Sequence, residues 1–415
     1  KDLRPEDIKL IDPCMGSGHI LVYAFDVLVQ IYKDAGYPER NIPELILTHN
    51  LYGLDIDDRA YQLAYFAVMM RAWNYNHRIL RKHIEPNLCA IQESNGLQKW
   101  SDIAPEMTGQ LTLDQSFIDM ADELIDTFHD AKEYGSILAV KNHDYDALLD
   151  YIRAIKEQGE LDLMFAAWLQ EIEDSLPVLV HQAQIMQTSY DVCVTNPPYM
   201  GASGMSAKLA EYVKANYANS KSDLFAVFIE RCAEMLADNR YQAMITQHAW
   251  MFLSSFEKLR HQLLNTEIIN MVHLGARAFE EIGGEVVQTT SFVRQKMKIT
   301  DFKGTYCRLI EPTSQQGKED MFLAGENRYT ASQDNFAKIP GSPIAYWLGK
   351  HMFSTFESKK MAESFIIRNG ISTGDNVRYL RFWYEINPQE YWKPCNKGGS
   401  YRKWYGNNDY FGSVV

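Results

Sequence analysis

The chain has 415 residues, of which 46% are hydrophobic and 23% are charged, so it is long enough for roughly two or three packed domains and too apolar for a disordered tail. No run approaches the roughly 18 consecutive apolar residues that a membrane-spanning helix requires, and the charged first residues hold no apolar signal-peptide core. The six cysteines show neither a CxxC pair nor zinc-type spacing, which argues against a structural metal or a disulfide framework and favours a reducing, cytoplasmic compartment.

The net charge of −13 is confined to one segment of the chain. Residues 97–190 hold 18 Asp and Glu against 5 Lys and Arg, so the remainder is neutral. The acidity of the whole chain therefore does not exclude contact with nucleic acid by its other parts. Because the sequence begins without methionine, we also expect it to be a fragment of a longer protein.

The first hundred residues alternate between short apolar runs and longer helical stretches. Residues 8–12 predict a strand, and a turn with glycines leads into a helix at about residues 18–33. Residues 51–54 predict a second strand, followed by a helix at about residues 59–81, and residues 88–91 predict a third strand. This alternation indicates a parallel sheet with helices on its faces.

Residues 97–185 interrupt this alternation. Apolar residues recur there at helical spacing with acidic residues between them, so we expect an α-helical insertion with a solvated face. Contact with DNA phosphates requires cations, and we do not expect it from this segment. Alternation then resumes, with a helix at residues 223–236 and strands at residues 190–195, 241–246, 268–274 and 284–298.

These segments predict a discontinuous catalytic domain, residues 1–96 and 186–310, with the insertion at 97–185. Residues 311–358 connect it to a C-terminal region, 359–415, which we expect to be the start of a target-recognition domain. Nine Lys and Arg lie among its aromatic residues, a combination suited to following a nucleic-acid backbone and stacking on bases. A solvated domain edge with its own core aromatics is an equally good interpretation.

Two motifs stand at the ends of the first two predicted strands. Residues 12–18 (DPCMGSG) form a turn into a helix, where glycines let the backbone approach a ligand closely. Asp55 ends the second strand, where a carboxylate is placed to accept hydrogen bonds from both hydroxyls of a ribose. Taken alone, the first motif is equally compatible with an ordinary tight turn.

A third motif, residues 196–199 (NPPY), follows the buried strand at 190–195. Its prolines fix the backbone and remove two N–H donors, so the Asn196 side-chain oxygen and the Pro197 carbonyl become acceptors suited to an exocyclic amino group. The ring of Tyr199 is placed to stack on a planar base taken out of its duplex. An Asn-Pro turn that only ends the strand is the alternative.

In this order, the three motifs resemble those of the gamma-class amino-methyltransferases, which methylate adenine N6 in DNA. Residues 223–225, 284–298 and 369–374 look like later motifs of that family. The nearer match, through IDPCMGSGHILVYAFDVL and DVCVTNPPYMG, is to the PglX-type methyltransferases of BREX phage-defence systems. The resemblance spans about residues 8–380 and treats the acidic segment as an insertion.

This resemblance implies a Rossmann-like α/β sheet of seven strands, S-adenosylmethionine as the methyl donor and no metal. It places the target adenine of double-stranded DNA on Asn196, Pro197, Pro198 and Tyr199. Glu93 stands where the family carries a third acid on the cofactor side, although the chain has no clear Asp there. The other implied cofactor residues are Asp12, Pro13, Gly16 and Gly18 for the methionine part, Asp55 for the ribose and Ile56 for the adenine ring.

Three functions are therefore open to test. The first is methylation of adenine N6 in DNA, within phage defence or restriction-modification. The second is N-methylation of RNA or of a protein glutamine, because Asn-Pro-Pro-Tyr motifs serve such enzymes as well. The third is a non-catalytic cofactor-binding scaffold whose acidic insertion binds other defence-system proteins. The basic and aromatic C-terminal region favours DNA, and we expect no membrane partner.

Overall fold

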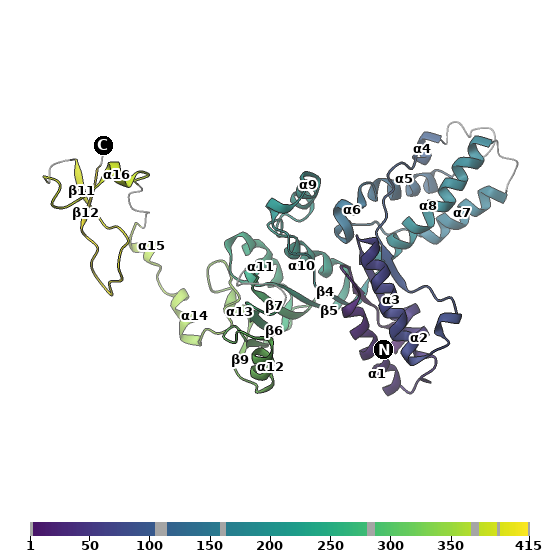
Figure 1. The fold of residues 1–415 in the computed structure, drawn as a ribbon, viewed down its shortest axis with the longest axis horizontal. Coiled ribbons are helices and arrows are strands. Elements are labelled where there is room, and N and C mark those ends of the chain that lie inside the picture. The colour runs from purple at the N-terminus through teal and green to yellow at the C-terminus, as the bar shows by residue number, and fades with distance from the viewer. Residues whose placement is uncertain are drawn as a thin grey trace. The chain divides into compact units, whose positions relative to one another are not determined.

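The structure is a computed structural model that describes residues 3–103, 114–157, 163–279, 287–366, 373–387 and 391–413. The chain divides into two compact units, Lys1–Phe353 and Ser354–Val415 (Figure 1). No helix among the described residues is both long enough and apolar enough to cross a lipid bilayer.

The first unit is built on a nine-stranded mixed sheet in the order β3-β2-β1-β4-β5-β7-β6-β8-β9. Strands β1 to β5 are parallel, whereas β7 pairs antiparallel with both β5 and β6. The expected Rossmann-like sheet is confirmed, and β8 and β9 extend it beyond the seven expected strands. The strands are β1 (Leu10–Asp12), β2 (Leu51–Asp55), β3 (Asn87–Ala90), β4 (Tyr190–Thr195), β5 (Leu236–Gln247), β6 (Glu267–Gly275), β7 (Thr289–Gln295), β8 (Gly304–Arg308) and β9 (Arg328–Ala331).

The strand order reverses between β1 and β4. The chain moves outward from β1 to β2 and β3, and then returns to pair β4 against the other side of β1. In open α/β sheets the crevice at such a switch point, outside the carboxyl ends of the strands, is the usual ligand site. Asp12 ends β1 and Thr195 ends β4, so the first and third motifs both begin at this switch point.

Helices α1 (His19–Asp34) and α3 (Asp58–Tyr75) follow β1 and β2 and pack on each other. The chain buries Leu21, Phe25 and Leu28 of α1, which recur every three or four residues and form the face turned toward the core. The other helices of this unit outside the insertion are α2 (Ile42–Leu45), α9 (Ala207–Asn216), α10 (Leu224–Met235), α11 (Glu257–Leu263), α12 (Gln315–Leu323) and α13 (Gln333–Phe336).

Gly18 starts α1 in a left-handed conformation, with φ of 82°, and a methyl group on it would lie 2.9 Å from the Cα of Ala64 in α3. Gly18→Ala should therefore lower the free energy of unfolding by about 2–4 kcal/mol, from backbone strain plus steric conflict. Gly36→Ala is the matched control, because its φ is 83° but no atom lies within 4 Å of the added carbon. Urea denaturation measures both variants, and equal losses would contradict a role for close helix packing.

The expected helical character of residues 97–185 is confirmed where the structure describes them, and these helices gather beside the sheet (Figure 1). The segment has a core of its own, in which the rings of Trp100 and Trp168 lie 5.5 Å apart. Its helices are α4 (Trp100–Ile103), α5 (Gln115–Thr127), α6 (Ala131–Tyr134), α7 (Tyr145–Glu157) and α8 (Leu163–Gln187), with a single turn of 3₁₀ helix, η4, at Gly135–Ile137.

The second unit contains a small antiparallel sheet in the order β10-β12-β11. Cations of this unit lie over aromatic rings: Arg381 in β10 is 6.0 Å from the ring centre of Trp392 in β11, and Lys403, between β11 and β12, is 5.5 Å from that of Trp404. The predicted boundaries at 97, 186, 311 and 359 stay predictions, and residues 284–286 and 369–372 of the later motifs lie outside the described residues. The remaining elements are α14 (Lys350–Glu357), α15 (Met361–Ser364), α16 (Asn376–Tyr379), β10 (Leu380–Phe382), β11 (Trp392–Cys395) and β12 (Tyr410–Ser413).

Candidate active site

Asp12 is a fully buried carboxylate at the end of β1. Its Oδ1 accepts hydrogen bonds from the Thr195 hydroxyl, at 2.7 Å, and from the Cys14 backbone N–H, at 3.1 Å. Its Oδ2 is buried and has no hydrogen-bond partner among the described residues. Burial raises the pKa of Asp12 to about 7, and the nearby charge of Asp55 adds to the rise while the two hydrogen bonds oppose it.

The hydrogen bond between Thr195 and Asp12 joins two motifs that are far apart in the sequence. It is buried and spans 183 residues of chain. Thr195 directly precedes Asn196, and β4 pairs with β1. The NPPY segment therefore starts next to the end of β1. The structure therefore brings the glycine turn and the NPPY segment together at the switch point of the sheet.

Asp55 lies against the glycine turn at the end of β2. Its Oδ2 accepts the N–H of Gly16, at 2.9 Å, and its Oδ1 accepts that of Asp57, also at 2.9 Å. Gly16 has φ of 52°, a left-handed conformation that favours glycine. Each carboxylate oxygen keeps a further lone pair for a ligand hydroxyl. Asp57 instead caps α3 by accepting the N–H of Arg59, at 2.7 Å, which is a structural role.

Ile56 and Glu93 differ in their surroundings. The Ile56 side chain is 48% exposed, and a Cβ on Gly135 would lie 2.8 Å from its Cγ2, so it borders the insertion. The Glu93 side chain is exposed, and its carboxylate accepts the backbone N–H of Lys132, at 3.1 Å, and the amide of Asn95, at 3.2 Å. These contacts tie Glu93 to the insertion, and its role toward a cofactor stays a prediction.

The NPPY segment presents Asn196 to solvent at the carboxyl end of β4 and buries Pro197, whereas Pro198 is exposed. The Tyr199 hydroxyl donates to Asn196 Oδ1, at 3.2 Å, which orients the amide. Because a carbonyl oxygen has two lone pairs, Oδ1 still has one acceptor position for a substrate amine. Burial raises the pKa of Tyr199 to about 12, so its hydroxyl stays a donor at neutral pH.

The N-terminus of α10 supports this segment. Asp223 caps the helix at Phe225 N–H, at 3.4 Å, and also accepts the N–H of Met200, at 3.1 Å. The Phe225 ring meets the Tyr199 ring edge to face, with centres 6.1 Å apart. Helix α10 thereby fixes the backbone after the NPPY segment and the tilt of the tyrosine ring.

Sequence reasoning missed two residues that hold this site together. Thr195 carried a usable signal, since it is a polar residue at the end of a buried strand and directly before Asn196. Ser136 carried none, because it lies deep in the acidic insertion. Its hydroxyl nevertheless donates to the Pro13 carbonyl within the glycine turn, at 2.6 Å.

The residues at the switch point fit S-adenosylmethionine. The buried Asp12 Oδ2 lacks a partner, and an ammonium group such as that of the methionine part would supply one. The Gly16 Cα faces open space, because nothing lies within 4 Å of a carbon added there. Asp55 has acceptor capacity for ribose hydroxyls, and the half-exposed Ile56 offers an apolar surface to a planar ring.

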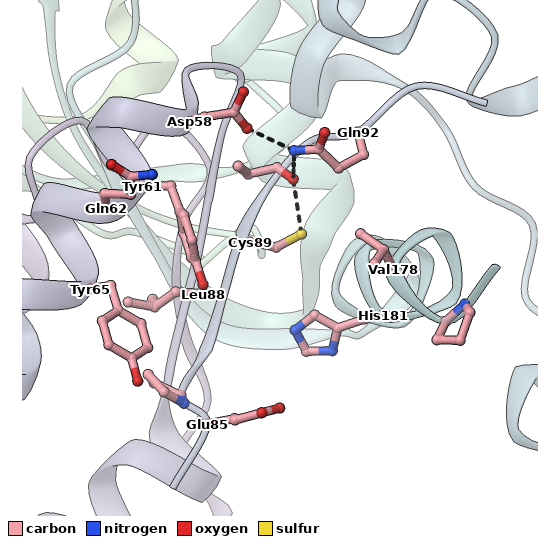
Figure 2. Close-up of a pocket in the computed structure, with 13 residues that line it drawn as sticks. Asp58, Tyr61, Gln62, Tyr65, Glu85, Leu88, Cys89, Gln92, Val178 and His181 are labelled. Carbon is pink, nitrogen blue, oxygen red and sulfur yellow. Dashed lines mark hydrogen bonds between the residues drawn. The ribbon is translucent and has the colours of Figure 1, made fainter. Parts of the chain in front are cut away.

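A hollow of about 860 Å³ lies elsewhere, beside the edge strand β3. Figure 2 shows Tyr61 and Tyr65 of α3 on one side of it and Val178 and His181 of α8 on the other. The residues that line it include no member of the three motifs. It therefore separates the insertion from the sheet edge and is distinct from the crevice between β1 and β4.

The glycine turn and the NPPY segment meet at the switch point of an α/β sheet, which defines the class: the chain is a Rossmann-like α/β protein. Residues 49–279, more than half of the chain, match the model of the Eco57I restriction-modification methylases. The chain belongs to that family.

Two curated relatives are similar along almost the whole chain. The adenine-specific methyltransferase PglX of Lacticaseibacillus casei (strain Zhang) is 41% identical over 97% of this chain and 35% of its own length. The adenine-specific methyltransferase BrxX of Escherichia coli O9:H4 (strain HS) is 36% identical over 98% of this chain and 36% of its own length. The chain thus spans about a third of these relatives. The DrdV–DNA complex is a similar solved structure, with a TM-score of 0.45 and 12% identity over 78% of this chain and 27% of that one.

Proposed function

We propose that this chain transfers the methyl group of S-adenosylmethionine to N6 of adenine in double-stranded DNA, as part of phage defence or restriction-modification. The observation that carries the proposal is the buried hydrogen bond between Thr195 and Asp12, because it sets the base-binding segment against the cofactor turn. The names of the relatives PglX and BrxX, both adenine-specific methyltransferases, support the same activity.

When bound, S-adenosylmethionine supplies a methyl group already activated by its sulfonium, so the protein mainly has to position the two reactants. The Asn196 side-chain oxygen and the Pro197 carbonyl accept hydrogen bonds from the adenine amino group and stabilise the positive charge that develops on N6. The Tyr199 ring stacks on the base once it has left the duplex. Asp12 and Asp55 would hold the cofactor through its ammonium group and its ribose hydroxyls.

Two variants separate the roles of the Tyr199 ring and hydroxyl. Tyr199→Phe keeps the ring and loses the hydroxyl that lies 3.2 Å from Asn196 Oδ1 and 3.4 Å from the Ile245 carbonyl, so activity should stay within about tenfold of the wild type. Tyr199→Ala also loses the stacking surface and should lower kcat/KM for DNA by roughly a further tenfold or more. Steady-state kinetics on one DNA substrate measures both, and equal losses would contradict stacking by the ring.

A methyl-transfer assay tests the proposal. The protein is incubated with methyl-labelled S-adenosylmethionine and, in separate reactions, with DNA, RNA or protein. We expect label in double-stranded DNA, recovered as N6-methyladenine after digestion to nucleosides. Label in RNA or in a protein glutamine, and none in DNA, would show that RNA or protein is the substrate. If no substrate is labelled although the cofactor binds, the chain is a scaffold.

Further partners belong to this proposal as well. We propose that the acidic insertion contacts other defence-system proteins, because Asp119 and Asp126 of α5 are exposed carboxylates on its surface. The cations and rings of the second unit, such as Lys403 and Trp404, are proposed to contact DNA. Because DNA is the proposed substrate, the cytoplasm is the proposed location.

A further inference from the structure

Residues 130–137, here called the strap, belong to the acidic insertion but are tied to the catalytic sheet on two sides. Toward β3 and α3, the Lys132 ammonium pairs with Asp58, at 2.7 Å, and its backbone N–H donates to Glu93, at 3.1 Å. Toward α9, the Ser206 hydroxyl donates to Glu133, at 2.7 Å. The strap is therefore anchored on both sides of the switch point.

The C-terminal end of the strap, residues 135–137, is buried. The Ser136 carbonyl accepts the Nε–H of Arg231 in α10, at 3.0 Å, and the Ile137 carbonyl accepts the hydroxyl of Tyr217, at 2.7 Å. Ser136 is 3% exposed and Arg231 is 6% exposed. These bonds fix the turn from the side of α10, so the Ser136 hydroxyl has a defined direction.

That hydroxyl holds one peptide unit of the glycine turn. It donates to the carbonyl of Pro13, and the N–H of the same peptide unit, that of Cys14, donates to Asp12 Oδ1. The peptide plane is thus held at its two opposite ends, by Ser136 and by Asp12. Because the Cys14 N–H and Thr195 both occupy Oδ1, the other oxygen of Asp12 is left free for a ligand.

We propose that the strap forms a wall of the cofactor site and that Ser136 is a positioning residue for S-adenosylmethionine; this rests on the proposed function and adds to it. Ser136 keeps the peptide after Pro13 in the orientation that leaves Asp12 Oδ2 facing the ligand. On the adenosine side the strap reaches Ile56 through Gly135, where a side chain would displace the isoleucine. The insertion is therefore part of the cofactor site as well as a separate surface.

Ser136→Ala tests this inference by calorimetry with S-adenosylmethionine. Loss of the hydrogen bond should weaken binding about tenfold and raise the KM for the cofactor similarly, with kcat at saturation unchanged. Ser116→Ala is the matched control, because that hydroxyl lies in the same insertion and bonds only to the exposed Asp114. The control should bind as tightly as the wild type.

A second variant covers the case in which Ser136→Ala folds poorly. Gly135→Ala adds a carbon 2.8 Å from Ile56 Cγ2 at a residue whose φ is 63°, so it should lower the thermal unfolding temperature as well as weaken cofactor binding. Cofactor affinity is therefore compared below that temperature, where circular dichroism shows the variant to be folded. A merely structural role would lower kcat together with the folded fraction and leave KM alone. Wild-type affinity in folded Ser136→Ala would overturn the strap proposal only, whereas a wild type that binds no cofactor would overturn the proposed function with it.

Discussion

Replacing Asn196 by alanine should lower the rate of methyl transfer, at saturating cofactor and DNA, by about a hundredfold or more. The reason is that the variant removes the proposed acceptor for the adenine amine, whose hydrogen bond strengthens as positive charge develops on N6. Asn196 makes no hydrogen bond to the glycine turn, and its described partner is the Tyr199 hydroxyl. Cofactor affinity should therefore stay within about twofold of the wild type.

Single-turnover kinetics measures this rate, and calorimetry measures cofactor affinity. Asn216→Ala is the matched control, because among the described residues the Asn216 side chain bonds only to the Tyr212 carbonyl, at the exposed end of α9. It should transfer methyl groups at the wild-type rate. Full activity in Asn196→Ala would exclude this side chain from the chemistry, and a joint loss of cofactor binding would show that it acts on the cofactor turn instead.

Asp12→Asn should have the largest effect on cofactor binding: the affinity for S-adenosylmethionine should fall about a hundredfold. Asparagine keeps an acceptor oxygen for the Thr195 hydroxyl, so the link between the two motifs survives. It loses the negative charge that the unpartnered Oδ2 offers to an ammonium group. Unchanged affinity would contradict the assignment of Asp12 to the methionine part.

The same variant should change how stability depends on pH. Burial raises the pKa of Asp12 from 3.8 to about 7, so between those values the folded protein binds more protons at this site than the unfolded chain. The contribution of Asp12 to wild-type stability therefore falls as pH rises through this window, by about 4 kcal/mol in all, and then levels off. Asparagine does not titrate and escapes this loss.

Urea denaturation of wild type and Asp12→Asn at pH 4 and pH 8 isolates that contribution. The difference in unfolding free energy should move in favour of the variant by about 4 kcal/mol between these values. Glu230, whose pKa burial also raises to about 7, is present in both proteins and cancels from the difference. If the difference in unfolding free energy did not depend on pH, burial would not raise the pKa of Asp12.

Much of the site could be predicted from the sequence because its residues stand where parallel strands end. Asp12, Asp55 and Asn196 each follow a short apolar run, and the carboxyl ends of parallel strands lie at one edge of a sheet. The glycines at 16 and 18 were informative for a related reason, since both adopt left-handed conformations next to that edge.

Other parts could not be predicted, because they depend on tertiary contacts across long separations. Ser136 meets Pro13 across 123 residues, and nothing in the acidic, helical surroundings of Ser136 marks it. Charge patterning made the insertion look like a solvated module, whereas residues 135–137 of the strap within it are buried. The extension of the sheet by β8 and β9 was likewise missed, since short strands in a polar context carry little periodicity.

Long-read sequencing of host DNA tests the central claim most directly, with the intact gene compared against the same gene carrying Asn196→Ala. We expect N6-methyladenine at a recurring sequence when the gene is intact and its loss at every such site in the variant. Identical patterns of modified bases in the two strains would contradict it.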